Sequence, residues 1–294
     1  MNTFIPKLVI FGVGLIGGSL ALGLKQSGAV GEVVGVGRSA ENLQIALDLG
    51  IIDRIATDVR DALADADVVL LAVPVGQMAA VMQRIAPHLA AHTLVTDVGS
   101  TKQDVIALMQ QHFSAQLGNC VPAHPIAGAE LSGATAARAD LYQTKNLVLT
   151  PLPAVTNPDA IARIAAMWRL CGAQISIMSA IEHDAIFAAV SHLPHLLAYA
   201  LVDMIAQRDN AGQLFGFAAG GFRDFTRIAS SSPEMWRDIA MANRSALIGE
   251  LDAYQAQLTQ LKNALIKLDS AALTSIFSAA QQARSAWLTR GGAE

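Results

Sequence analysis

The first half of the chain alternates short apolar runs with longer stretches of helical periodicity. The short runs are rich in β-branched residues and are apolar almost throughout, without the regular polar alternation of a half-exposed strand. Strands that are covered by helices on both faces of a parallel sheet have this pattern. The sequence predicts strands at residues 7–12, 32–37, 67–73, 93–99, 120–125, 146–151 and 173–178.

Glycines mark where the helices between these runs end. The stretches 18–28 and 40–50 have helical periodicity, and they stop at Gly28 and Gly50. Glycine is common just past the last turn of a helix, because it adopts the left-handed conformation there without a steric cost. The alternation of strand and helix predicts an α/β domain over residues 1–178, with a Rossmann-type, doubly wound and mainly parallel sheet.

After about residue 178 the strand pattern disappears. Pro233 suits the first turn of a helix, whereas Pro194 falls inside a helical stretch and should kink or divide it. We therefore predict an all-α second domain over residues 179–294. Its long helical stretches are 180–208, 233–268 and 270–289.

A glycine-rich turn lies between the first predicted strand and the first helix. Gly12, Gly14 and Gly17 form the pattern GxGxxG at the start of a βαβ unit. In such a unit the first glycine permits the tight turn, the second lets the backbone approach a pyrophosphate, and the third lets the helix pack on the strand. The helix that begins at Leu15 and Ile16 offers unpaired N–H groups to the phosphates. This context predicts dinucleotide binding, with a purely structural glycine turn as the alternative.

The end of the second predicted strand bears on which dinucleotide binds. An acidic residue is expected there when the adenosine ribose has a free 2′-hydroxyl. This chain has Arg38 and Ser39 instead. An arginine and a serine suit a 2′-phosphate, although Arg38 could also be an exposed residue at a strand end. We expect NADP in preference to NAD.

Composition excludes several other classes of protein. The net charge is −4 and no basic run is present, which argues against a nucleic-acid surface. The two cysteines, Cys120 and Cys171, are too few for a disulfide framework or a thiolate metal site. The hydrophobic fraction of 53% raises the question of a membrane span, but glycines interrupt the apolar run 8–24. The first residues, MNTFIPK, lack the features of a signal peptide, so we expect a cytoplasmic protein without a metal, nucleic-acid or membrane partner.

Candidate catalytic residues follow the predicted strands, because ligands of such sheets bind beyond the carboxyl ends of the strands. Val73 and Pro74 could line the nicotinamide side of the cofactor site. His124 has a near-neutral ordinary pKa, which suits it to accept a proton from a substrate hydroxyl while hydride leaves the same carbon. Ser100 could bond that hydroxyl or orient the imidazole, or it could simply be a turn or capping residue.

Five segments together resemble the prephenate and arogenate dehydrogenase family of tyrosine biosynthesis. The first is shared with many dehydrogenases, whereas the combination of the other four is specific. Thr101 stands where the family often has valine. The segments are GVGLIGGSL, DVGSTK, HPIAGAELSG, SHLPH at 191–195 and GGFRDFTRIASSSPEMWRDIAMAN at 220–243.

The resemblance implies an oxidative decarboxylation of prephenate or arogenate. Hydride would pass from ring carbon C4 to NAD(P), carbon dioxide would leave from C1, and the ring would become aromatic. In that reaction His124 would be the general base, Ser100 would assist at the C4 hydroxyl, and Arg227 would bind the ring carboxylate. The resemblance also implies that the helical half forms a homodimer interface.

Other residues at family positions have roles that the sequence leaves open. The family pattern suggests that His195 contacts the side chain of the substrate, near the loop around Gly220. From spacing alone, His192 and His195 could also be half of a metal site or a polar spot in an apolar helix. Three more residues fall on family positions near the active-site entrance. Charge pairing at that entrance and ordinary core packing would both place such residues there, so their roles stay open. These three residues are Glu130, Asp224 and Trp236.

Two other interpretations remain open. One is a dehydrogenase of the 3-hydroxyacid or ketopantoate type, which relies on a lysine in the helical domain, where this chain has Lys262 and Lys267. The other is a non-catalytic NADP-sensing protein. A sensor has no need of a base and a carboxylate-binding arginine in one cleft, so His124 and Arg227 argue against it.

Overall fold

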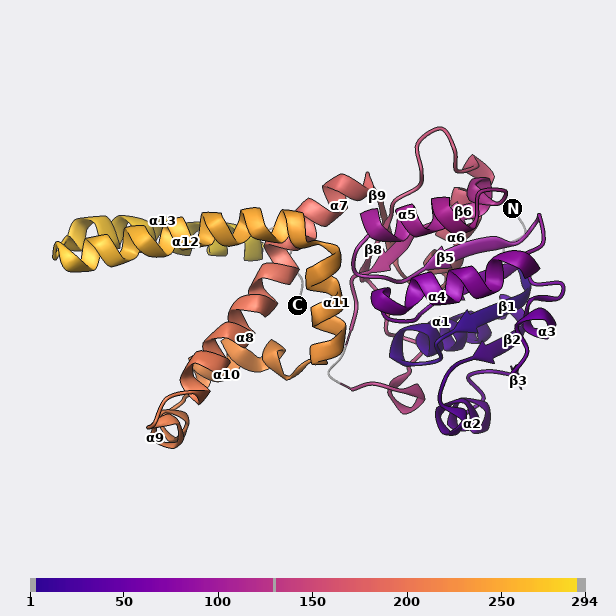
Figure 1. Cartoon of the computed structure of the whole chain (residues 1–294), viewed down its shortest axis with the longest axis horizontal. Coiled ribbons are helices and arrows are strands. Elements are labelled where there is room, and N and C mark those ends of the chain that lie inside the picture. The colour runs from indigo at the N-terminus through magenta and orange to yellow at the C-terminus, as the bar shows by residue number, and fades with distance from the viewer. Residues whose placement is uncertain (1–3, 129–130, 290–294) are drawn as a thin grey trace. The chain divides into compact units, whose positions relative to one another are not determined.

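The first sheet has six parallel strands. A computed structural model of the protein describes residues 4–128 and 131–289. The strands follow the doubly wound order β3-β2-β1-β4-β5-β6, which confirms the predicted fold class (Figure 1). Their bounds are β3 Arg54–Ile55, β2 Val30–Val36, β1 Ile5–Phe11, β4 Val68–Leu71, β5 Leu94–Asp97 and β6 Cys120–Val121.

Successive residues of β1 explain why both faces of this sheet are buried. Leu8 and Ile10 belong to one core, whereas Val9 and Phe11 belong to the other, because side chains alternate between the faces of a strand. On the first face pack α1 (Leu15–Gln26), α2 (Ala40–Asp48) and α6 (Pro158–Leu170). On the second pack α3 (Val59–Leu63), α4 (Val75–Ile85) and α5 (Gln103–His112). The near-continuous apolar runs of the sequence follow from this double coverage.

Predicted helix ends at two glycines are confirmed. Gly28 and Gly50 follow α1 and α2 with φ of +64° and +67°. The backbone therefore turns out of each helix through the left-handed region.

The predicted strand 120–125 is wrong in one respect, because it divides at Pro122 into β6 and β7 (Ala123–Pro125). Proline has no N–H to donate to a neighbouring strand, so pairing is interrupted there. Beyond it, β7 pairs antiparallel with β8 (Asn146–Leu149), and β8 pairs parallel with β9 (Gln174–Ile177). This switch of sheets places His124 on a separate three-stranded sheet.

The predicted helix 180–208 is divided, as Pro194 led us to expect. It forms α7 (Ala180–Phe187), a π-helical turn at Ala188–His192 and α8 (Leu193–Ala206). By length and composition the stretch Ala180–Ala206 could cross a membrane. Three polar side chains of this stretch are nonetheless buried within the protein, namely those of His183, Asp184 and His192.

The predicted helix 233–268 is also two helices, because it breaks at Asn243. Pro233 begins α11 (Pro233–Ala242), as expected, and the helix α12 spans Arg244–Ile266. Two short helices that the sequence pattern did not predict precede α11, namely α9 (Ala211–Gly216) and α10 (Gly220–Thr226). The remaining elements are α13 (Ser270–Thr289) and short 3-10 turns at Ala86–His88, Leu117–Asn119, Ala134–Ala136 and Arg227–Ser230.

Backbone contacts group residues 1–244 as one compact unit and residues 245–294 as another. The first unit contains both sheets and also α7 to α11, because α7 packs on α5 and α11 packs on α4. The second unit consists of α12 and α13, which leave several large apolar side chains exposed, including Ile248, Phe277 and Trp287. The predicted boundary at residue 178, where strands give way to helices, stays a prediction.

Two glycines of the first turn should respond differently to alanine. At Gly17 a Cβ would lie 2.7 Å from the Gly12 carbonyl oxygen, whereas at Gly14 nothing lies within 4 Å. We expect Gly17→Ala to lower the free energy of unfolding by about 1–3 kcal/mol, as overpacking does. Gly14→Ala should unfold like the unchanged protein in urea but bind dinucleotide more weakly. Equal stability of the two variants would contradict this account of the turn.

Candidate active site

The glycine-rich turn forms the floor of a large cleft. Gly12 has a φ of +96°, and a Cβ there would clash with the Ala72 carbonyl oxygen, so only glycine fits. Gly14 is the N-cap of α1 and has no side chain to satisfy the first N–H groups of that helix. The open space at Gly14 and these N–H groups are the features that a pyrophosphate requires.

This cleft has a volume of about 1030 Å³ and brings together most of the predicted cofactor residues. Arg38 and Ser39 line one side, where β2 leads into α2. Val73 and Pro74, between β4 and α4, line another part. Leu15, Ile16, Gly17 and Ser100 are not among its lining residues, and the assignment of individual contacts stays a prediction.

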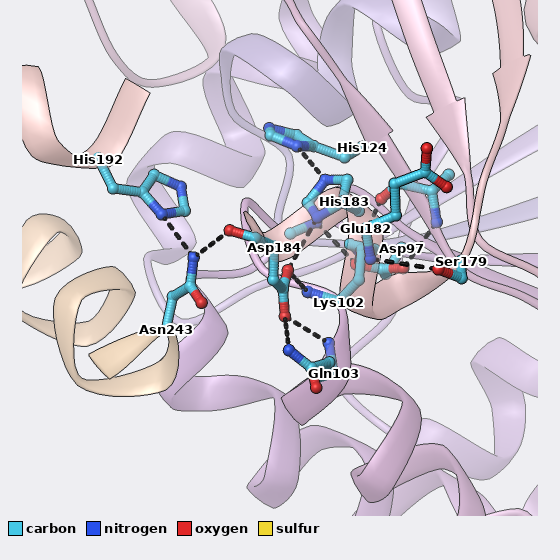
Figure 2. Close-up of polar contacts among 12 residues, drawn as sticks. Asp97, Lys102, Gln103, His124, Ser179, Glu182, His183, Asp184, His192 and Asn243 are labelled. Atoms are coloured by element: carbon cyan, nitrogen blue, oxygen red, sulfur yellow. Dashed lines mark hydrogen bonds and ion pairs between the residues drawn. The ribbon is translucent and has the colours of Figure 1, made fainter. Parts of the chain in front are cut away.

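A chain of three side chains lies at the carboxyl edge of the first sheet. The Nδ1 atom of His124 is 2.8 Å from Nε2 of His183, and Nδ1 of His183 is 2.8 Å from Oδ1 of Asp184 (Figure 2). His124 comes from β7, whereas the other two come from α7. The second sheet and the second half of the chain thus meet at His124.

The partners of Asp184 fix where the protons lie. Burial acts to raise the pKa of this carboxylate, but hydrogen bonds from His183 and from the backbone N–H groups of Gln103 and Lys102 outweigh burial and lower the pKa. Asp184 is therefore ionised, and Nδ1–H of His183 donates to it. In neutral His183 the Nε2 atom is then an acceptor for Nδ1–H of His124. Nε2 of His124 is left with a free lone pair, which is the form that a general base requires.

Several groups keep His124 uncharged. Burial, followed by the nearby His183, Lys102 and His192, lowers the pKa of His124 well below its usual value. Burial also lowers the pKa of His183. At neutral pH the imidazole of His124 is thus available to accept a proton.

A buried ion pair shapes the loop that carries Ser100. The side chains of Lys102 and Asp97 are fully buried and pair with each other. Lys102 Nζ also donates to the Ala123 carbonyl at 2.8 Å, and Asp97 accepts the Gly99 N–H at 2.7 Å. Ser100 therefore lies on a turn that Asp97 and Lys102 hold at both ends, and both of these residues also bond to Ala123, which precedes His124.

His192 is a second neutral imidazole in this region. Asn243 Nδ2 lies 2.8 Å from the Asp184 carbonyl oxygen, which can only accept, and 3.1 Å from His192 Nδ1. His192 Nδ1 must therefore accept, and its proton must be on Nε2. That N–H is buried and makes no hydrogen bond of ideal geometry within the described residues, but it lies beside the backbone of Ser100, which acts to raise the pKa of His192.

The other predicted substrate residues lie on α8 and beyond it. His195 stacks on Trp236 with ring centroids 3.5 Å apart, and its Nδ1 donates to the Ser191 carbonyl at 2.9 Å. Burial lowers the pKa of His195, and nearby Arg227 adds to this effect. Arg227 is exposed at the start of its 3-10 turn.

Gly220 and Asp224 are exposed on α10, and Glu130 lies outside the described residues. His192 and His195, which by spacing alone could be half of a metal site, belong to no group of three metal-ligating side chains within residues 4–128 and 131–289. The substrate roles of these residues stay predictions.

Sequence reasoning missed four residues that organise the site. His183 and Asp184 lie in a helical stretch that is otherwise mainly apolar, and the signal that marks them is two adjacent ionisable residues soon after the last strand. Lys102 ends the DVGSTK segment, but its burial has no signature in the sequence. Asn243 ends the 220–243 segment, but its role depends on bonds to Asp184 and His192, which are distant in the chain.

Fold and site together define a class of protein: an oxidoreductase that binds a nicotinamide dinucleotide across a Rossmann-type sheet. Family models for the nucleotide-binding and dimerization domains of prephenate dehydrogenase match residues 20–177 and 179–279. The chain therefore belongs to the prephenate dehydrogenase family, and the resemblance seen in its motifs is confirmed.

Individual relatives agree along nearly the whole chain. A cyclohexadienyl dehydrogenase of Zymomonas mobilis is 37% identical over 98% of both chains. A prephenate dehydrogenase of Bacillus subtilis is 35% identical over 97% of this chain and 76% of its own. The crystal structure of prephenate dehydrogenase from Aquifex aeolicus with hydroxyphenyl propionate and NAD+ has a TM-score of 0.89 and 33% identity, covering 96% of this chain and 98% of its own.

Acid should destabilise the protein through its buried histidines. Burial lowers the pKa of His192 from 6.5 to about 4, so the unfolded chain binds a proton before the folded one does as pH falls. As pH falls from about 6.5 to about 4, protonation of His192 in the unfolded chain should lower the free energy of unfolding by about 3 kcal/mol. Urea denaturation across the range should show a shallower pH dependence for His192→Gln than for the exposed-site control His92→Gln. Equal pH dependence in both would contradict the assignment.

Proposed function

We propose that this enzyme converts prephenate, arogenate or both to 4-hydroxyphenylpyruvate or tyrosine, with hydride transfer to NADP in preference to NAD. The observation that carries the proposal is the chain of two 2.8 Å contacts that joins Asp184, His183 and His124, because it leaves the Nε2 lone pair of His124 free to accept a proton. Membership of the prephenate dehydrogenase family supports the choice of substrate. A sensing protein has no need of such a base.

In this proposal the protein's own residues handle a single proton. His124 Nε2 accepts the proton of the C4 hydroxyl as the C4–H bond breaks, and Ser100 holds that hydroxyl. The bound nicotinamide supplies the hydride acceptor. The C1–carboxylate bond then breaks, its electron pair enters the ring, and carbon dioxide leaves. His124 returns its proton to the C4 oxygen as the ring becomes aromatic, so the base is regenerated.

The remaining residues would bind and orient the substrate. Arg227 would pair with the ring carboxylate until it leaves as carbon dioxide, for which a planar guanidinium is well suited. His195, fixed by its stack on Trp236, would contact the substrate side chain. His192, which lies beside the backbone of Ser100, would line the substrate side of the site.

The preference for NADP rests on the end of β2. Arg38 and Ser39 line the cleft where an acidic residue would be needed to bind a free 2′-hydroxyl. The Ser39 oxygen accepts the Asn42 N–H at 3.1 Å, and its own hydrogen remains available to a phosphate. Either cofactor fits the glycine-rich floor, so these two residues carry the choice.

We also propose a cytoplasmic homodimer. The chain contains the dimerization domain of its family. The large apolar side chains exposed on α12 and α13 form surface of the kind that an interface covers.

Steady-state rates should be measured with prephenate or arogenate, each with NAD or NADP. We expect turnover with at least one substrate, and a kcat/KM for NADP about tenfold or more above that for NAD, since a charged hydrogen bond of ~1.4 kcal/mol suffices. Equal efficiency with both cofactors would remove the assigned role of Arg38. No turnover in any combination by folded, NADP-binding protein would contradict the proposed reaction.

Asp184→Asn tests whether the hydrogen-bonded chain Asp184–His183–His124 sets the tautomer of His124 or only contributes to packing. The amide that this substitution introduces can donate to His183 Nδ1, which would reverse both hydrogen bonds and place a proton on His124 Nε2. We expect kcat to fall by about 10²–10⁴-fold with KM little changed, by analogy with the loss of the correct tautomer in a catalytic triad. His124→Asn should show a similar loss while still binding NADP.

The matched control is Asp203→Asn, at an exposed position of α8. Its kcat should equal that of the unchanged enzyme. If Asp184→Asn retains kcat, or loses activity only in parallel with its melting temperature, the hydrogen bonds from Asp184 through His183 do not set the tautomer of His124.

A further inference from the structure

A second arginine lines the cofactor cleft in addition to Arg38. Arg84 is exposed in the last turn of α4, and together with Gln77, Ala80 and Val81 it forms the side of the cleft that α4 provides. These residues are spaced by three, four and seven positions, so they share one face of the helix. The cleft is therefore bounded both by Arg38, after β2, and by this face of α4.

The positive charge of these arginines is not balanced within the described part of the chain. No aspartate or glutamate is among the described residues that line the cleft. Within residues 4–128 and 131–289, the ion pairs involve other arginines, such as Arg54 and Arg237, and neither Arg38 nor Arg84. Two unpaired guanidinium groups on one cleft are the arrangement that a bound anion stabilises.

The position of Arg84 indicates which anion. Pro74, at the start of α4, is the residue that we expect on the nicotinamide side. A helix rises 1.5 Å per residue, so Arg84 is about 10 Å further along α4 than Gln77 and lies toward the other end of the cofactor. The pyrophosphate has its own site at the N-terminus of α1. The remaining anionic group of the cofactor is the adenosine 2′-phosphate, which carries a charge near −2 and three acceptor oxygens, as other phosphate monoesters do.

We infer that Arg84 is a specificity-determining residue, which binds the 2′-phosphate of NADP together with Arg38 and Ser39. This inference rests on the proposed preference for NADP. Arg38 approaches the phosphate from the loop after β2, and Arg84 approaches it from α4. Because the two come from different elements, the phosphate also ties α4 to the β2–α2 connection.

Isothermal titration calorimetry with 2′,5′-ADP and 5′-AMP tests this directly, because these probes differ only in the 2′-phosphate. We expect the unchanged protein to bind 2′,5′-ADP more tightly. Arg84→Ala should lose about tenfold in affinity for 2′,5′-ADP and little for 5′-AMP, while Arg84→Lys should keep part of the difference. Arg163→Ala, at an exposed position of α6 on the other face of the sheet, is the control.

Combining Arg38→Ala with Arg84→Ala gives a double-mutant cycle. Losses that are not additive are expected, because both groups contact one phosphate. Equal losses for the two probes in Arg84→Ala would overturn the inference by showing an adenine or structural role, and so would an unchanged affinity for 2′,5′-ADP. If the unchanged protein does not distinguish the probes, the inference fails, whereas turnover of prephenate with NAD would show that the proposed reaction stands.

Discussion

The carboxylate of Asp184 is the group on which the site depends. It binds two backbone N–H groups at the start of α5 and the imidazole of His183 in α7, so it joins the parallel sheet to the helices that follow both sheets. The same bonds hold it ionised, and its charge then determines the tautomer of His183 and, through it, that of His124. One buried negative charge therefore fixes a contact between distant elements and the direction of a proton transfer.

A buried charge of this kind is costly unless it is paired, and the protein pairs several around one edge of the sheet. Lys102 and Asp97 are fully buried, and each also bonds to backbone near Ser100 or His124. Removing one member of such a pair leaves the other uncompensated, which costs about 3–5 kcal/mol. Their arrangement makes the loop rigid, and the charge of Lys102 adds to burial in lowering the pKa of the neighbouring His124. The charges of Lys102 and Asp97 thus affect both the stability of the fold and the pKa of the proposed base.

The π-helical turn at Ala188–His192 has a comparable double role. It precedes Pro194, whose missing N–H a regular helix could not accommodate without a kink, and it places His192 against Asn243. The apolar helix that results carries polar side chains to the sheet edge and leaves apolar ones exposed. Its hydropathy alone therefore says little about its surroundings.

The order of residues along the chain was enough to predict the parallel sheet, the glycine-rich cofactor turn, the helix ends at Gly28 and Gly50, and the candidate base His124. These depend on local periodicity and on backbone conformations that only certain residues adopt. The folded structure was needed to show that Pro122 separates two sheets, and that His183, Asp184, Lys102 and Asn243 form one connected group next to His124. Several of their hydrogen bonds join residues that are far apart in the chain: His124 and His183 are 59 positions apart, and Lys102 and Asp184 are 82. No local pattern encodes such contacts.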